Sequence, residues 1–222
     1  VVGAQGQQFS LEWGSNGSGN GQFGAQRGVA VADDGSVYVA DTANHRIQKF
    51  DADGNYLLQW GSNGTGNGQF DTPMGVAVAS DGTVFISDLF NDRIQYFDSA
   101  GTYLGQFGST GTGNGQLDSP RGIDFGPDGN LYVADAYNYR IQVFTPAGAY
   151  LRQWGSFGSG NGQFNAPRDL AVDAVGDVYV TDSFNDRVQK FDSAGTYLLQ
   201  WGTNGTADGQ FDFPRGIDID TA

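Results

Sequence analysis

The sequence predicts an all-β fold assembled from repeated small sheets, and three observations support this. A unit of 47 residues recurs without insertion or deletion, as shown by the evenly spaced positions Trp13, Trp60, Phe107, Trp154 and Trp201. Short apolar runs alternate with Asp-Gly and Ala-Gly turns. Aspartate, which favours turns, supplies nearly all of the acidity, whereas the helix-surface residues glutamate and lysine are rare.

Four strands are expected in each unit. In the first full unit the apolar runs are residues 28–32 (GVAVA), 37–40 (VYVA), 46–50 (RIQKF) and 56–60 (YLLQW). Asp34-Gly35 and Asp53-Gly54 provide turns between them, and residues 42–44 interrupt the pattern between the second and third strands. No segment carries a helical period.

A period of 40–50 residues with four strands is typical of β-propeller blades. We therefore expect a single domain over residues 1–222, with full blades at about 27–60, 74–107, 121–154 and 168–201. The partial units 1–13 and 215–222 are predicted to supply strands at residues 9–13 and 216–220. The chain is too short for six such blades, so either its ends meet in an incomplete fifth blade or it is an arc or fragment of a larger ring; we favour the second.

The segment after the second strand reads DTANHRI, DLFNDRI, DAYNYRI and DSFNDRV in the four units. This resembles the NHL repeat, whose hallmark is an Asp-x-x-Asn-x-Arg-Ile core. The resemblance covers nearly the whole chain and implies a toroidal propeller, six-bladed in the best-known members. Some members of the NHL-like class are lyases that rely on several histidines, whereas this chain has only His45.

The Asp41, Asn44 and Arg46 set recurs in all four units, which favours a blade-building role over a single active site. Asp and Asn are expected to satisfy backbone donors in the turn, and Arg to bind a neighbouring carboxylate. Most aromatic residues fall on five registers of the repeat, headed by Phe9, Trp13, Phe23, Tyr38 and Phe50, and are expected in the core.

The long Gly- and Asn-rich loops should share one face with the turns between second and third strands, and recognition normally uses such loops. At the start of the innermost strands stand Arg27, Arg121, Arg168 and Arg215, with Met74 as the exception. This ring could bind a carboxylate-bearing ligand, or each arginine could pair with an aspartate such as Asp71 or Asp118. Aromatic residues outside the five registers fall on or near the same face and either contact a partner or pack between loops: Phe90, Tyr137, Tyr139, Phe157 and Phe184.

Composition excludes several classes of function. The formal charge of −14 and the pI near 4.1 argue against nucleic acid. Absence of cysteine excludes disulfides and thiolate metal sites, and no apolar stretch is long enough to span a membrane. A single histidine argues against zinc and general-base sites, so no cofactor or metal is expected. Possible glycosylation sites lie in the long loops at Asn16, Asn63 and Asn204.

The sequence therefore predicts a non-enzymatic binding or scaffolding module that recognises a protein or glycan through the long-loop face, with an acidic partner as one option. Acidity, absent thiols and the glycosylation motifs favour an extracellular, cell-surface or periplasmic location. One alternative is a structural subunit that self-associates through open blade edges into rings or filaments. A weaker alternative is a metal-dependent lyase of the NHL-like class.

Overall fold

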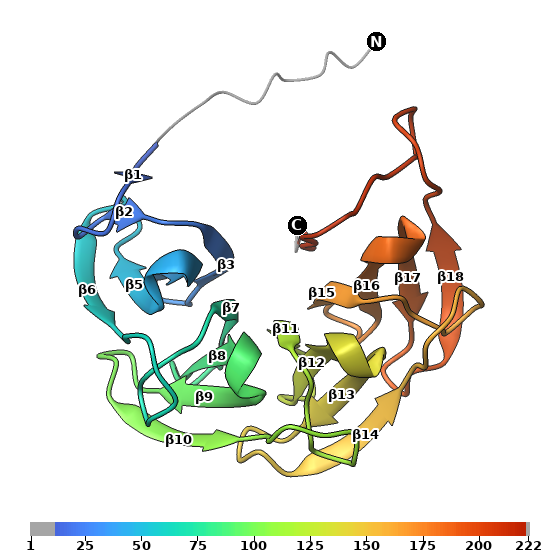
Figure 1. Cartoon of the computed structure of the whole chain (residues 1–222), viewed down its shortest axis with the longest axis horizontal. Coiled ribbons are helices and arrows are strands. Elements are labelled where there is room, and N and C mark those ends of the chain that lie inside the picture. Colours follow the sequence, from blue (N-terminus) through green and yellow to red (C-terminus); the bar gives the residue numbers. More distant parts are fainter. Residues whose placement is uncertain (1–11, 221–222) are drawn as a thin grey trace.

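The computed structural model describes residues 12–220, which contain four four-stranded antiparallel blades arranged around a common axis (Figure 1). Blade 1 comprises β3 (Gln26–Val31), β4 (Val37–Asp41), β5 (Arg46–Phe50) and β6 (Tyr56–Trp60), and blade 2 comprises β7 (Pro73–Val78), β8 (Val84–Asp88), β9 (Arg93–Phe97) and β10 (Tyr103–Phe107). Blade 3 comprises β11 (Pro120–Phe125), β12 (Leu131–Asp135), β13 (Arg140–Phe144) and β14 (Tyr150–Trp154), and blade 4 comprises β15 (Pro167–Val172), β16 (Val178–Asp182), β17 (Arg187–Phe191) and β18 (Tyr197–Trp201). The predicted all-β propeller is confirmed.

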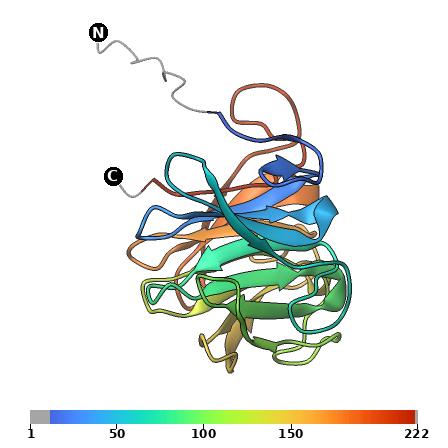
Figure 2. The ribbon, with the colours of Figure 1, turned by 90° about the vertical axis from the view of Figure 1, so that its left-hand side faces the viewer.

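Within each blade the strands follow chain order from the axis outward, and the first strand lies innermost (Figure 1). The four blades form an arc that is open between blade 1 and the C-terminal segment (Figure 1). Figure 2 shows the blades from the side, with neighbouring sheets stacked on one another. Stacking explains the continuous apolar runs, because β4, β8 and β12 are buried along their whole length.

A single turn of 3-10 helix joins the second and third strands of each blade, where the sequence predicted only an interruption. These turns are η1 (Thr42–Asn44), η2 (Leu89–Asn91), η3 (Ala136–Asn138) and η4 (Ser183–Asn185). The residue after each turn is left-handed, with φ of 51–55° at His45, Asp92, Tyr139 and Asp186. This local reversal brings the third strand back antiparallel to the second.

The core lies between blades. Trp60 of blade 1 packs on Phe97 of blade 2, with ring centroids 5.6 Å apart, beneath Gly101. The equivalent tryptophans at the two ends of the arc lack part of this packing within the described residues. Trp13 packs on Phe50 of blade 1 but belongs to no blade itself, and no blade follows Trp201 within residues 12–220, so they are 39% and 40% exposed. Aromatic residues on the repeat registers are therefore core residues, as expected, except where the arc ends.

Two strand predictions at the ends of the chain are wrong or lie outside the described residues. Residues 216–220 form no strand, although they run toward the axis where a further innermost strand would lie (Figure 1). A strand needs a hydrogen-bonded neighbour, and residues 12–220 contain none for this segment. The segment is held instead by side chains of blade 4: the Ser183 hydroxyl donates to the Pro214 carbonyl (2.6 Å), just as Thr42 donates to Pro73. Of the predicted strand at 9–13, residues 9–11 lie outside the described part, and Trp13 belongs to no strand.

Candidate functional site

The long loops are fixed by a buried network that begins at Asp41 in blade 1. The Asp41 carboxylate is fully buried and accepts hydrogen bonds from Arg46 Nε (2.7 Å), Asn44 Nδ2 (2.9 Å) and the Gly24 amide (2.8 Å). The same guanidinium donates to three carbonyl oxygens of the preceding loop, those of Ser18, Gly19 and Gln22, at 2.7–2.8 Å. The arginine thus ties its own blade to the loop that leads into it.

This network recurs in every blade, at Asp88–Asn91–Arg93, Asp135–Asn138–Arg140 and Asp182–Asn185–Arg187. The predicted blade-building role of the Asp-x-x-Asn-x-Arg set is confirmed. Sequence reasoning missed a fourth member two residues further on, Gln48, Gln95, Gln142 and Gln189. These glutamines are fully buried, and each bonds both the aspartate and the loop. The sequence could have revealed this fourth member, because glutamine occupies the position in all four units.

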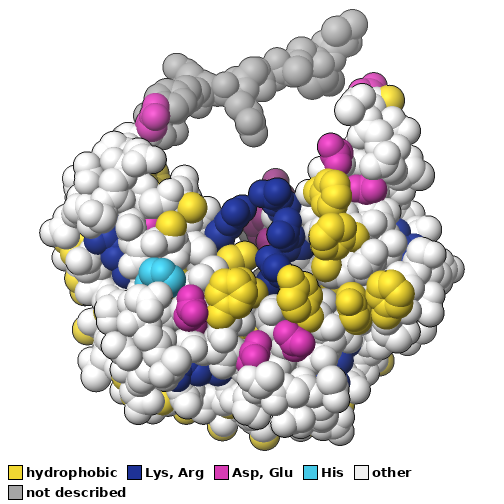
Figure 3. Space-filling view, viewed as in Figure 1, with side chains coloured by type: hydrophobic (Ala, Val, Ile, Leu, Met, Phe, Trp, Pro, Cys, Tyr) yellow, Lys and Arg dark blue, Asp and Glu magenta, His cyan; other side chains and the backbone are white. Residues whose placement is uncertain are grey.

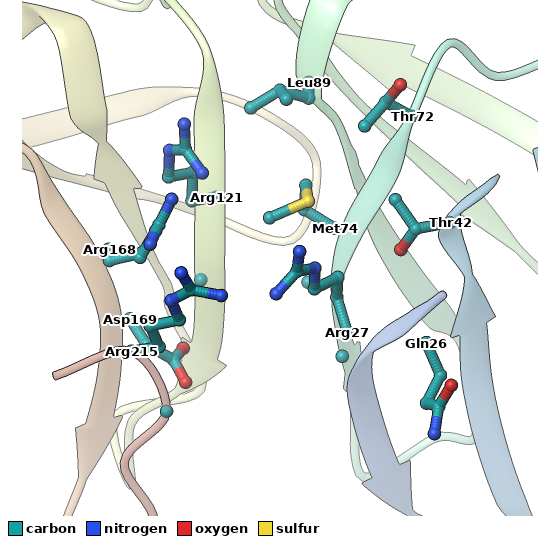
Figure 4. A pocket seen from close by; sticks show the side chains of 14 residues that line it. Gln26, Arg27, Thr42, Thr72, Met74, Leu89, Arg121, Arg168, Asp169 and Arg215 are labelled. Atoms are coloured by element: carbon teal, nitrogen blue, oxygen red, sulfur yellow. The ribbon is translucent and has the colours of Figure 1, made fainter. Parts of the chain in front are cut away.

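At the axis, on the long-loop side, the four ring arginines surround a cavity of about 370 Å³ (Figures 3 and 4). Arg27, Arg121 and Arg168 project from β3, β11 and β15, and Arg215 projects from the C-terminal segment (Figure 4). Met74 of β7 lies among them. The structure therefore brings together the arginines that the sequence placed at this channel mouth.

None of these four arginines has a carboxylate of residues 12–220 within 4.0 Å, since the ion pairs of the described chain all involve other cations: His45, Arg46, Arg93, Arg140, Arg152, Arg187 and Lys190. The alternative expectation, pairing with Asp71 or Asp118, is wrong. Those aspartates lie on the long loops, and Asp71 instead approaches His45 (3.8 Å).

The positive charges of the ring repel one another, which favours binding of an anion. The buried Nε of Arg121 has no hydrogen-bond partner in the described chain. Burial lowers the pKa of both Arg121 and Arg168, and the other three ring arginines lower the pKa of Arg168 further by repulsion. Tyr137 acts in the opposite direction and favours the charged form of Arg121. An anion in the cavity would relieve the repulsion and satisfy the unpaired donor.

Exposed aromatic rings flank the arginines on this face (Figure 3). Phe90, Tyr137 and Phe184 occupy the same repeat position in η2, η3 and η4 and are 63%, 53% and 55% exposed. Phe213, which sequence reasoning missed, packs edge-on against Phe184 at 5.2 Å. It occupies a register position where the other units carry Ala25, Thr72, Ser119 and Ala166, so only its departure from the repeat could have revealed it.

Tyr139 and Phe157 form a separate pair on the loops, with centroids 4.9 Å apart. In the other blades a polar link occupies these two positions, for example Thr110 Oγ1 to Asp92 (2.6 Å) and Asn204 Nδ2 to Asp186 (2.9 Å). For Tyr139 the interpretation as loop packing is therefore the better one. For Phe90 and Tyr137, whose rings are mostly exposed, contact with a partner remains the prediction.

His45 has the same linking role as those aspartates. Its Nδ1 accepts a hydrogen bond from the Thr72 amide (3.1 Å), as Asp92 accepts from the Ser119 amide (2.8 Å). The position therefore joins neighbouring blades.

Two carboxylates that the sequence did not single out lie deeper in the channel. Asp169 accepts from the Ile217 amide (3.2 Å), and Asp124 accepts from the Val172 amide (2.8 Å), so each links one inner segment to the next. Burial raises the pKa of Asp169 to about 7 and that of Asp124 to about 6, and the nearby carboxylate of Asp218 contributes to both shifts.

Two further features bear on the class of site. No group of three or more His, Cys, Asp or Glu residues within 12–220 could hold a metal ion, and no helix in that range could cross a membrane. Asn16, Asn63 and Asn204 are exposed on the long loops, as a glycosylation site requires.

Comparison with known proteins finds NHL repeats in this chain. The NHL repeat family model matches residues 27–50, 117–144 and 164–191, which fall in blades 1, 3 and 4; the last two matches begin at the end of the preceding loop. Protein lin-41 of Caenorhabditis elegans is 45% identical over 47 residues, which make up 21% of this chain and 4% of that protein.

Two solved structures illustrate the shared fold. Virginiamycin B lyase from Staphylococcus aureus aligns over 87% of this chain and 59% of its own, with a TM-score of 0.64 and 19% identity. A chain of the nidogen/laminin complex aligns over 79% of each chain, with a TM-score of 0.53 and 21% identity. The chain thus spans little more than half of the lyase and a small part of lin-41. The comparisons therefore show NHL repeats at three positions of the chain, and the described residues form a β-propeller of four blades.

Proposed function

We propose that this protein is a non-enzymatic binding module whose long-loop face recognises a protein or glycan through a carboxylate group. The observation that carries the proposal is the ring of four arginines without carboxylate partners in the described chain, set around a cavity at the axis. An NHL propeller is a scaffold suited to protein binding, and the nidogen/laminin neighbour is itself a complex.

The side chains of this face suit a ligand with two parts, a carboxylate and an apolar group beside it. Guanidinium groups bind carboxylates with paired, charge-assisted hydrogen bonds, and the cavity is of a size for one acidic group and its neighbours. The rings of Phe90, Tyr137 and Phe184 would then contact apolar groups beside that acid, since exposed aromatic residues near arginine are typical of binding hot spots. A protein loop with an acidic tip meets both requirements, as does an acidic sugar.

The lyase alternative has weaker support. NHL-like lyases rely on several histidines, and the single His45 of this chain is engaged with the Thr72 amide on the loops. The exposed glycosylation motifs support an extracellular or periplasmic location, which we propose together with the function.

The test compares acidic probes with their neutral counterparts. Peptides with a central Glu and flanking Phe, and glycans ending in a sugar acid, are titrated against the protein beside versions with Gln or the neutral sugar. We expect preference for the acid, and a loss of at least about tenfold in affinity when Arg121 and Arg168 are both changed to Glu.

Arg152→Glu is the control, because Arg152 lies on the outermost strand β14 and its substitution changes the charge as much as each of the two ring substitutions does. Circular dichroism checks that both variants fold. Equal affinity of the wild type for acidic and neutral probes, or unchanged affinity in the Arg121→Glu/Arg168→Glu variant, would refute the proposed role of the ring.

A further inference from the structure

Blade 2 differs from the other described blades where its residues reach the cavity. Three repeat positions form this part of each blade: the second residue of the innermost strand and the first two residues of the 3-10 turn. In blade 2 these residues are Met74, Leu89 and Phe90. The equivalents are Arg27, Thr42 and Ala43 in blade 1, Arg121, Ala136 and Tyr137 in blade 3, and Arg168, Ser183 and Phe184 in blade 4. Among these four blades, only blade 2 is apolar at all three positions.

The three apolar residues form one strip that runs from the cavity to the long-loop face. Met74 and Leu89 line the cavity, and Phe90, the next residue along the chain, is 63% exposed on that face. The Leu89 amide donates to the Thr72 carbonyl (3.3 Å), and the Phe90 amide donates to the Asp71 carbonyl (3.2 Å). These bonds hold the turn against the segment that leads into Met74.

The surroundings of this strip are complete on both sides. The innermost strand of blade 2, β7, packs between β3 of blade 1 and β11 of blade 3. The apolar strip is therefore a property of the interior of the arc and is independent of both of its ends.

The cavity consequently has two unlike walls. Figure 4 shows Met74 across the cavity from Arg121 and Arg168. Leu89 is 5% exposed, so the turn packs firmly behind the apolar wall. On the opposite wall, Arg121 keeps a buried Nε without a partner in the described chain. A ligand that fills this cavity meets guanidinium donors on one side and apolar side chains on the other.

A sugar acid suits this arrangement poorly. Each sugar hydroxyl that leaves water needs a new hydrogen-bond partner, and the side chains of Met74, Leu89 and Phe90 offer no donor and no strong acceptor. The hydroxyl of Thr72, which also lines the cavity, already donates to the carboxylate of Asp71 (3.3 Å). An aliphatic side chain gains from the same wall, because its burial removes apolar area from water.

We infer that Met74 determines specificity at the arginine ring and selects a protein segment in which a carboxylate side chain lies next to an aliphatic side chain. The carboxylate binds the guanidinium groups of Arg121 and Arg168, and the aliphatic side chain packs on Met74 and Leu89. The segment then leaves the cavity past Phe90. This inference rests on the proposed function and narrows its ligand from a protein or glycan to a protein.

The test uses three acetylated and amidated peptides, Gly-Leu-Glu-Leu-Gly, Gly-Ser-Glu-Ser-Gly and Gly-Leu-Gln-Leu-Gly. Isothermal titration calorimetry measures their affinity for the protein, together with that of an oligosaccharide that ends in glucuronic acid. We expect the leucine-flanked glutamate peptide to bind about tenfold more tightly than the serine-flanked one, because an aliphatic side chain leaves water. The glutamine peptide and the oligosaccharide should both bind more weakly than the leucine-flanked glutamate peptide.

Two substitutions of Met74 separate its apolar contact from charge. Met74→Gln keeps the length of the side chain and adds no charge, so the preference for leucine over serine should fall to about threefold or less. Met74→Arg gives blade 2 the residue of the other units and should strengthen binding of the serine-flanked peptide. Leu104→Gln and Leu104→Arg are the matched controls, because Leu104 lies on the outermost strand of the same blade and is 51% exposed. Both controls should keep the wild-type preference.

The inference is overturned if Met74→Gln keeps the wild-type preference for leucine, or if the wild type binds the two glutamate peptides equally. It is also overturned if the oligosaccharide binds more tightly than either glutamate peptide. These outcomes differ from failure of the proposed function, in which the Arg121→Glu/Arg168→Glu variant binds the acidic probes as well as the wild type does. If no probe binds the wild type, both are refuted.

Discussion

Arg140 provides the sharpest test of how the blades are held together, through the substitution Arg140→Ala. Its guanidinium donates to five oxygen atoms at 2.7–2.9 Å: Asp135 Oδ2, Gln153 Oε1 and the carbonyls of Thr112, Gly113 and Gln116. Asp135 is fully buried, so the alanine variant leaves a carboxylate without its cation in the interior.

Removing one partner of a buried ion pair costs about 3–5 kcal/mol in free energy of unfolding. For a domain of this size each kcal/mol lowers Tm by about 2–4 °C, so the expected fall is about 6–20 °C. Arg140→Lys keeps the charge but loses the forked geometry, and we expect an intermediate effect.

The assay is urea unfolding followed by tryptophan fluorescence, with Arg152→Ala as control. Arg152 is a partly exposed arginine that lies 3.6 Å from Asp128 and donates hydrogen bonds to the Ser193 carbonyl and the Tyr132 hydroxyl, and its loss should cost about 1–2 kcal/mol. If Arg140→Ala destabilises the protein no more than Arg152→Ala does, the network does not hold the loop to the blade as we describe.

Two further predictions concern the channel. Gly75→Ala should lower the free energy of unfolding by about 1–3 kcal/mol, because the new Cβ would lie 2.5 Å from the Arg121 carbonyl oxygen of the next blade. Gly216 occupies the same repeat position but has only Asp169 nearby (3.8 Å), so Gly216→Ala should be nearly neutral. Equal urea midpoints for the two variants would contradict this prediction. Since the pKa of Asp169 in the folded protein is about 7, well above its value in an unfolded chain, the folded state binds the extra proton and stability should decline as pH rises from about 4 to 7. Asp169→Asn should flatten that decline in urea midpoints measured at pH 5 and pH 8, and an unchanged slope would exclude Asp169 as its source.

Much of this architecture follows from the spacing of the repeat. A constant interval between equivalent residues fixes the number of strands and the register of each blade, because any slip would turn the apolar residues to the wrong face. The role of the Asp-x-x-Asn-x-Arg set was likewise predictable, since four copies cannot form one active site.

What the sequence could not predict depends on distances between blades. Whether Arg121 meets Asp118 is decided by the separation of the innermost strand from the loop, which the repeat does not encode. Asp169 stands where the other units have glycine, so its place in the channel depends on the close approach of β15 to the C-terminal segment. Residues 216–220 have the pattern of a strand, but pairing requires a neighbour that residues 12–220 do not provide.

The arginine networks have a consequence for how the polypeptide is made. Each of these guanidinium groups reaches back only 24 to 28 residues, to the loop synthesised just before its own blade. Such contacts are local along the chain, and local contacts form rapidly. Each blade can therefore form its hydrogen bonds to the preceding loop soon after it leaves the ribosome. Its apolar strands then spend little time exposed to solvent during translation.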